Sequence, residues 1–263
     1  ILTTFLGAII TAAVTAVFTN SPGIFTNSDV VRPTTVPPVP PSPTSPTSES
    51  PVPTSRPSAS STPTAPPRTL HAGDYVLTEG IETVGLVRDT APDGPPDSQD
   101  SDAKFAACLG VPVAQVQSHE SDSADGPTLK STDELTILES HAYIVPAAEV
   151  IRDRTFFGHV QAPRCLGLLF FPGFQKAMSA GGMNATLDSA YSMTTPAGAT
   201  IAVRIGVTVT AANGNHVTWT FDMISIMSGR VESWITIMQL NGTPDPVVEQ
   251  NVTLQVAGKI VRQ

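Results

Sequence analysis

The chain is poor in basic residues and lacks the short motifs that mark common catalytic sites. It has 14 Lys and Arg against 23 Asp and Glu, a formal net charge of -9, which excludes a basic surface for nucleic acid or anionic lipid. It contains no nucleophile elbow, no Gly-rich phosphate loop and no His-Glu-x-x-His zinc motif. The five histidines are not at metal-ligand spacing: His71, His119, His141, His159 and His216. We therefore expect no enzyme activity, no catalytic residue, no metal site, no cofactor and no nucleic-acid partner.

Cysteine is also scarce, because Cys108 and Cys165 are the only two in the sequence. In an exported domain such a pair predicts one disulfide, whereas in the cytoplasm two free buried thiols would be the alternative. The compartment decides between the two, and the N-terminal part of the chain indicates the compartment.

Residues 1–19 are predicted to form a transmembrane or signal-anchor segment. Residues 1–18 include no charged side chain, and a helix of this length spans about 27 Å at about 1.5 Å per residue. That length is close to the hydrocarbon thickness of a bilayer, about 30 Å. A signal peptide cleaved after Ala13 or Ala16 is the alternative. We expect a single-pass protein of the cell membrane.

Residues 20–69 are predicted to be a disordered stalk. Between residues 32 and 68 the chain has 13 Pro and 15 Ser or Thr among 37 residues. Such a segment has too little apolar surface to offset the entropy lost on folding, and its prolines favour extended polyproline II. An anchor followed by such a stalk indicates a domain held outside the cytoplasm, which favours the disulfide between Cys108 and Cys165.

Residues 70–263 have globular composition and predict one α+β domain. An antiparallel β-meander is expected at residues 200–210, 217–227 and 231–240, because apolar residues alternate along the first two segments and tight turns separate the three. A final helix, capped by Thr243 or Asp245, should follow. Its apolar residues recur in steps of four: Val248, Val252, Val256 and Ile260. We expect this helix to cover the apolar face of the meander.

Further elements are expected before the meander. The sequence favours strands at 75–77 and 135–145, helices at 102–108 and 147–157, and a core segment at 164–178. Pro172 should break or kink this core segment. One or two of these helices would complete the cover of the sheet.

Cys108-Leu-Gly and Cys165-Leu-Gly frame two strands and a helix, and residues 222–230 run into a Gly-Arg turn before the C-terminal helix. In this order the chain resembles the secreted, sensor-like, LpqN-type lipoprotein domains of actinobacteria, whose fold is similar to the Mog1/PsbP type. The resemblance covers residues 104–262. It implies an envelope binding or sensory role and carries over no catalytic residue. The chain departs from the lipoproteins because it has no cysteine for lipid attachment near the anchor.

A ligand groove is expected beside the core segment, where apolar side chains exceed what one helix face can bury. The candidate residues are Leu166, Phe170 and Phe174. The partner would be an unknown envelope ligand of apolar or amphipathic character.

Asp222 is a polar residue among apolar strand neighbours. We expect it to face outward and to pair across the meander with Arg204 or Arg230, rather than to act as a functional carboxylate. His141 and His216 are likewise expected to be ordinary strand or surface residues.

Two functional hypotheses follow. The first is a membrane-tethered, extracytoplasmic binding or sensor-like domain without catalysis. The second is a cell-envelope hydrolase with a non-standard active site. A solvent-open cleft with convergent polar residues of shifted pKa would favour the hydrolase, whereas a filled core with only an apolar groove would favour the binding domain.

Overall fold

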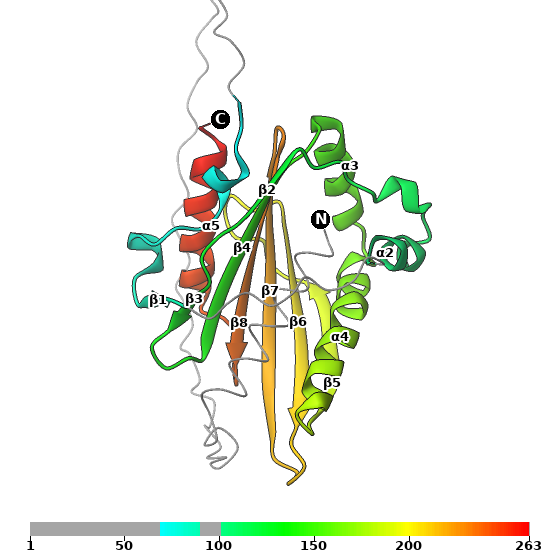
Figure 1. The fold of residues 1–263 in the computed structure, drawn as a ribbon, viewed down its shortest axis with the longest axis vertical. Coiled ribbons are helices and arrows are strands. Elements are labelled where there is room, and N and C mark those ends of the chain that lie inside the picture. Colours follow the sequence, from blue (N-terminus) through cyan, green and yellow to red (C-terminus); the bar gives the residue numbers. More distant parts are fainter. Residues whose placement is uncertain (1–68, 90–100, 263) are drawn as a thin grey trace, which may run out of the picture. The chain divides into compact units, whose positions relative to one another are not determined.

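The computed structural model describes residues 69–89 and 101–262, and Figure 1 shows how they fold. The predicted membrane segment at residues 1–19 and the predicted stalk up to residue 68 lie outside the described residues. Within the described ranges, no helix combines the length and the apolar composition needed to cross a bilayer.

An eight-stranded antiparallel sheet forms the middle layer of the fold. Its strands follow the order β1-β3-β4-β8-β7-β6-β5, and β2 also pairs with β4. The strand bounds are β1 Leu86–Arg88, β2 Asp122–Asp125, β3 Leu129–Ser131, β4 Thr136–Ile144, β5 Asn184–Ser192, β6 Ile201–Thr210, β7 His216–Ser228 and β8 Val231–Leu240. The predicted strand at 135–145 is therefore confirmed as β4.

Helices cover both faces of this sheet. They are α2 Ser101–Leu109, α3 Ala147–Phe157, α4 Ala162–Ala180 and α5 Pro246–Ile260, with short 3-10 helices η1 Ala72–Tyr75, η2 Ile81–Thr83 and η3 Val113–Gln115. Figure 1 shows α5 on one side of the sheet and α2, α3 and α4 on the other. The predicted α+β class, with a C-terminal helix and further helices over an antiparallel sheet, is confirmed.

The predicted meander corresponds to β6, β7 and β8, with ends within one residue of those expected. Successive side chains of a strand point to opposite faces. Ile205 and Phe221 are direct partners in the β6–β7 register, so their side chains lie on the same face, in the core under α4. The final helix is capped by Asp245, whose side chain accepts a hydrogen bond of 2.8 Å from the backbone N–H of Val247.

The final helix α5 packs on the face opposite to the one that we expected. The alternating apolar residues of β6, such as Val203 and Ile205, lie in the core under α4. In contrast, α5 shares a core with Ile224, Ile226 and Ile237. These side chains make the second face apolar as well, so the C-terminal helix covers that face while α4 covers the first.

Residues 75–77 do not form the expected strand. The helix η1 ends at Tyr75, whose carbonyl accepts a hydrogen bond of 3.0 Å from the Ser233 hydroxyl. The backbone N–H of Leu77 donates to the Ser140 hydroxyl at 2.9 Å. Because side chains of the sheet satisfy these buried backbone groups, the segment needs no partner strand.

Pro172 was expected to break or kink this segment, and helix α4 continues through it without a break. Proline removes the N–H that would otherwise bond to the Leu168 carbonyl. Pro172 and Leu168 are both exposed, so water can replace that bond. The buried side chains of Phe170 and Phe174 hold the helix against the sheet on either side of the proline.

Candidate functional site

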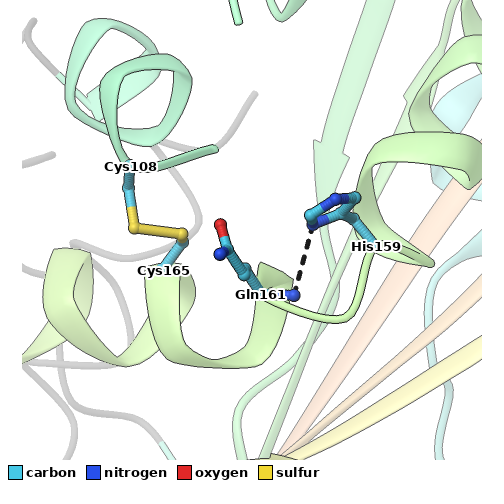
Figure 2. The surroundings of a disulfide bond; sticks show 4 residues. All are labelled: Cys108, His159, Gln161 and Cys165. Carbon is cyan, nitrogen blue, oxygen red and sulfur yellow. Dashed lines mark hydrogen bonds between the residues drawn. A yellow bond between two sulfur atoms is a disulfide. The ribbon is translucent and has the colours of Figure 1, made fainter. Parts of the chain in front are cut away.

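The predicted disulfide joins Cys108 on α2 to Cys165 on α4 (Figure 2). The two Cα atoms are 5.7 Å apart and 57 residues apart in sequence. Beside it, at the start of α4, Nδ1 of His159 accepts a hydrogen bond of 3.2 Å from the backbone N–H of Gln161. The disulfide therefore cross-links two helices on the same face of the sheet and serves as a structural brace.

The three residues of the predicted ligand groove are packed inside the core. Leu166, Phe170 and Phe174 are at most 1% exposed. The rings of Phe170 and Phe174 lie 4.6 Å and 5.6 Å from the ring of Phe221 on β7, measured between centroids. These side chains fill the space between α4 and the sheet themselves, and neither of the two cavities described below includes them. A ligand at this position stays a prediction.

An open groove of about 650 Å³ lies elsewhere, between the loop that follows β5 and the start of α5. We call it the rim groove. Its lining consists of residues 191–196 together with Arg204, Thr243, Pro244, Pro246, Glu249 and Gln250. Hydroxyl, amide and charged groups alternate there with proline, methionine and tyrosine side chains. Such a mixed lining suits a small amphipathic ligand.

Arg204 of β6 supplies the positive charge of the rim groove and is held in one orientation. Its Nε donates to Oδ1 of Asp222 at 2.6 Å, and its Nη2 donates to Oδ2 of Asp222 at 2.5 Å. The same Nη2 also donates to Oε1 of Glu249 at 3.2 Å. The bonds to Asp222 raise the pKa of Arg204 further above its ordinary value, so the guanidinium stays charged.

Asp222 pairs with Arg204 as predicted, and the two are direct partners in the β6–β7 register. The expectation that Asp222 faces outward is wrong, because it is 0% exposed. Its side chain lies on the face that α5 covers, and Glu249 of α5 shares the same guanidinium. The carboxylate is therefore a buried structural partner that orients Arg204.

Glu249 is the titratable group of the rim groove. Burial raises the pKa of Glu249 to about 7, and the neighbouring Asp222 carboxylate raises it as well, whereas the charge of Arg204 lowers it. With Glu249 ionised, the cluster of Arg204, Asp222 and Glu249 has a charge of −1. With Glu249 protonated, the cluster is neutral. In neither state is it net positive.

The wall formed by the loop after β5 is fixed to α5 by two hydrogen bonds. Gln250 of α5 accepts a bond of 3.0 Å from the backbone N–H of Ala197 and donates a bond of 3.1 Å to its carbonyl. The next residue, Gly198, has φ +91, and a Cβ there would lie 2.9 Å from the Cβ of Ala257. A larger residue would be strained at this φ and would collide with α5, so the loop requires a glycine at this position.

A second cavity, of about 20 Å³, lies on the other side of the sheet. It has room for about one water molecule. Glu232 and Asp153, which line it, are 1% and 4% exposed, and Oε1 of Glu232 makes no hydrogen bond to a described residue. Burial raises the pKa of Glu232 to about 8, and the charge of Asp153 raises it further. This acid pair is too enclosed to accept a substrate.

Three histidines are paired with carboxylates, the longest of these contacts being 3.9 Å between Nδ1 of His71 and Oδ2 of Asp122. His141, expected to be an ordinary strand residue, is buried in β4, and its Nδ1 lies 2.6 Å from Oδ1 of Asp125 on the neighbouring β2. His119 is exposed, and its Nδ1 lies 2.8 Å from Oε1 of Glu149 on α3. Across residues 69–89 and 101–262, no group of three or more His, Cys, Asp or Glu side chains could hold a metal ion.

The rim groove has no signature in the sequence. Its lining residues come from two loops, the strands β5 and β6, and the helix α5, and the two walls are about 50 residues apart in sequence. One contact beside the groove was predictable from the sequence. It is the pairing of Asp222 with an arginine, because the predicted meander puts the two residues on adjacent strands.

No protein-family model matches the chain, and no curated protein matches it either. Among solved structures, the chain is similar to the extracellular domain of PknH from Mycobacterium tuberculosis, with 8% identity over 61% of this chain and 91% of that chain. The TM-score of this match is 0.29, which is too low to carry an argument about fold or function. The resemblance to the LpqN-type domains therefore stays a prediction.

Proposed function

We propose that this protein is a membrane-tethered, extracytoplasmic binding or sensor-like module that holds a small amphipathic ligand in the rim groove without transforming it. The observation that carries the proposal is the oriented guanidinium of Arg204 in an open groove of about 650 Å³. Ligand sites are typically concave and mostly pre-formed, with a few polar groups fixed among apolar ones. The rim groove is concave, combines polar with apolar side chains, and contains a guanidinium that two hydrogen bonds hold in place.

The hydrolase remains the second candidate, because Glu249 combines an open groove with a pKa raised to about 7. A carboxyl group of this kind could act as a general acid. Hydrolysis also requires a base or a nucleophile near it. The nearest carboxylate, Asp222, is fully buried and has both oxygens bonded to Arg204, so it cannot reach a substrate. We therefore favour binding over catalysis.

The groove proposal is tested with the full chain in detergent micelles and a variant that fills the groove. Thr194→Trp places a large ring in the lining, and Ile151→Trp places the same ring on α3, where Ile151 is 68% exposed and outside the groove. Small molecules of an envelope extract that are retained by the protein are identified by mass spectrometry. A molecule retained by the wild type and Ile151→Trp but lost in Thr194→Trp supports the proposal, whereas equal retention in all three contradicts it.

The membrane tether has a separate test. The full chain should sediment with membranes, and a chain that begins at Arg32 should stay in the supernatant, because only residues before Arg32 contain the uncharged apolar run. Release of the full chain, with Ile1 still present, into the soluble fraction would contradict the tether and would leave the groove proposal unaffected.

A further inference from the structure

The charges of the rim groove argue against an ionic ligand. Arg204 and Glu249 are the only charged residues in its lining. Arg204 is already neutralised by the two bonds to Asp222, so an anion would meet no net positive charge. A cation would have only Glu249 to bind, because the carboxylate of Asp222 is fully buried, and Glu249 is itself only 4% exposed and already accepts a hydrogen bond from Arg204. The groove therefore favours a neutral ligand.

The groove also presents unused hydrogen-bonding groups. Nη1 of Arg204 makes no hydrogen bond to a described residue, while Nε and Nη2 are fixed by the carboxylates. Its two N–H groups are thus held in place for an oxygen acceptor. The hydroxyls of three lining threonines, Thr194, Thr195 and Thr243, make no hydrogen bond within the described part either, and each can donate and accept. Such an array matches a ligand that has several hydroxyl groups.

One aromatic ring in the lining offers a flat apolar surface. Tyr191 is at the end of the edge strand β5, is 48% exposed and lies directly opposite Arg204 in the β5–β6 register. Met193 and Pro196 follow it in the same wall. A ligand would therefore need an apolar face for the ring and hydroxyl groups around its edge.

We infer that the ligand of the rim groove is a neutral saccharide, which lies against the ring of Tyr191 and accepts hydrogen bonds from Nη1 of Arg204. A sugar ring has hydroxyl groups at its edge and C–H groups on its faces, and it carries no charge. This inference rests on the proposed function and names the ligand class for the same groove.

Saturation-transfer NMR on the full chain tests the inference. The micelles should use a detergent without a sugar headgroup, because a glycosidic detergent would compete. The probes are neutral disaccharides of glucose, galactose, mannose, arabinose and N-acetylglucosamine, with glucuronic acid as the charged comparison. At least one neutral probe should receive saturation, and glucuronic acid should receive less.

Variants then place the signal in the groove. Tyr191→Ala should reduce the affinity about tenfold, because the aromatic contact is lost, while Tyr191→Phe should retain most of it. Ile151→Ala, an exposed position on α3, should leave the signal unchanged. The absence of signal from every neutral probe overturns the inference, as does a signal that survives in Tyr191→Ala and in Thr194→Trp.

The two proposals fail in distinguishable ways. If no saccharide binds but an envelope molecule is still lost in Thr194→Trp, the saccharide class is wrong and the binding function stands. If the groove-filling variant retains every ligand, both are wrong. Release of shortened products from a bound probe would support the saccharide class and overturn the proposal that the module does not catalyse.

Discussion

Arg204 and Asp222 face each other across β6 and β7 with two parallel hydrogen bonds, of 2.6 Å and 2.5 Å, and only the carboxylate is fully buried. The pair is therefore asymmetric. The side chain of Arg204 is 19% exposed and also bonds Glu249, so it can find water or the second carboxylate if Asp222 is changed. Asp222 is fully buried, so removal of Arg204 leaves its charge buried without a positive partner.

This asymmetry predicts unequal costs for two substitutions. Arg204→Met should lower the free energy of unfolding by about 3–5 kcal/mol, since it leaves an unpaired buried carboxylate. Asp222→Asn should cost less, about 1–3 kcal/mol, because the amide oxygen can still accept from the guanidinium. Urea denaturation of both variants measures the difference. Equal costs, or a larger cost for Asp222→Asn, would contradict this description of the pair.

The disulfide should contribute strongly to stability. For a separation of 57 residues, the loop-entropy model gives about 4 kcal/mol, an upper value for real cross-links. Replacing both Cys108 and Cys165 by Ser should lower the free energy of unfolding by about 2–4 kcal/mol. Mass spectrometry after alkylation without reduction should find no modified thiol in the exported wild type. Two alkylated thiols under these conditions would refute the bond.

Gly198 should be required for the wall of the rim groove. Gly198→Ala puts a Cβ in a residue with φ +91 and within 2.9 Å of Ala257, so we expect a loss of about 2 kcal/mol or more. Gly214→Ala is the matched control, because Gly214 has φ +86 and an added Cβ there meets no atom within 4 Å. The excess cost of Gly198→Ala over Gly214→Ala isolates the contact with α5. Equal unfolding midpoints would show that the loop is not pressed against this helix.

The acid pair predicts that stability falls as the pH rises. In the folded state the pKa of Glu232 is about 8, above its ordinary value of 4.5. The folded state therefore binds more protons than the unfolded state between these values, and the contribution is full below pH 4.5 and lost as the pH rises through 8. Glu232→Gln should flatten this dependence and unfold at a higher urea concentration than the wild type at pH 8. If both proteins lose stability in parallel from pH 5 to pH 8, Glu232 is not the group responsible.

The sequence predicted the elements whose burial follows a simple period. Apolar residues alternate along much of β6, and α3 begins after Pro146, where proline fits the first turn, whereas β7 and β8 are buried on both faces. β5 was missed, because it lies at the edge of the sheet, contains an irregularity between Leu187 and Ser189, and has few buried side chains. An edge strand with one partner needs no continuous apolar face, so its sequence lacks the pattern.

The site was harder to predict than the fold for a related reason. From the sequence, Phe170 and Phe174 were expected to exceed the apolar surface that one helix face can bury. In the fold, their rings pack against each other and against the ring of Phe221 on β7, which leaves no groove between these described residues. The groove instead depends on how the loop after β5 approaches α5, which is set by contacts such as that between Ala197 and Gln250. Contacts between loops have no periodic sequence signature.

The central claim is that the ligand occupies the rim groove, and hydrogen–deuterium exchange of the full chain with and without the envelope extract tests it most directly. Backbone amides exchange more slowly where a ligand orders them. We predict slower exchange in peptides that cover residues 191–200 and 241–250, with no change in peptides that cover residues 165–178. Two outcomes would contradict the account. One is slower exchange only in residues 165–178. The other is unchanged exchange in every segment although the protein has retained a molecule from the extract.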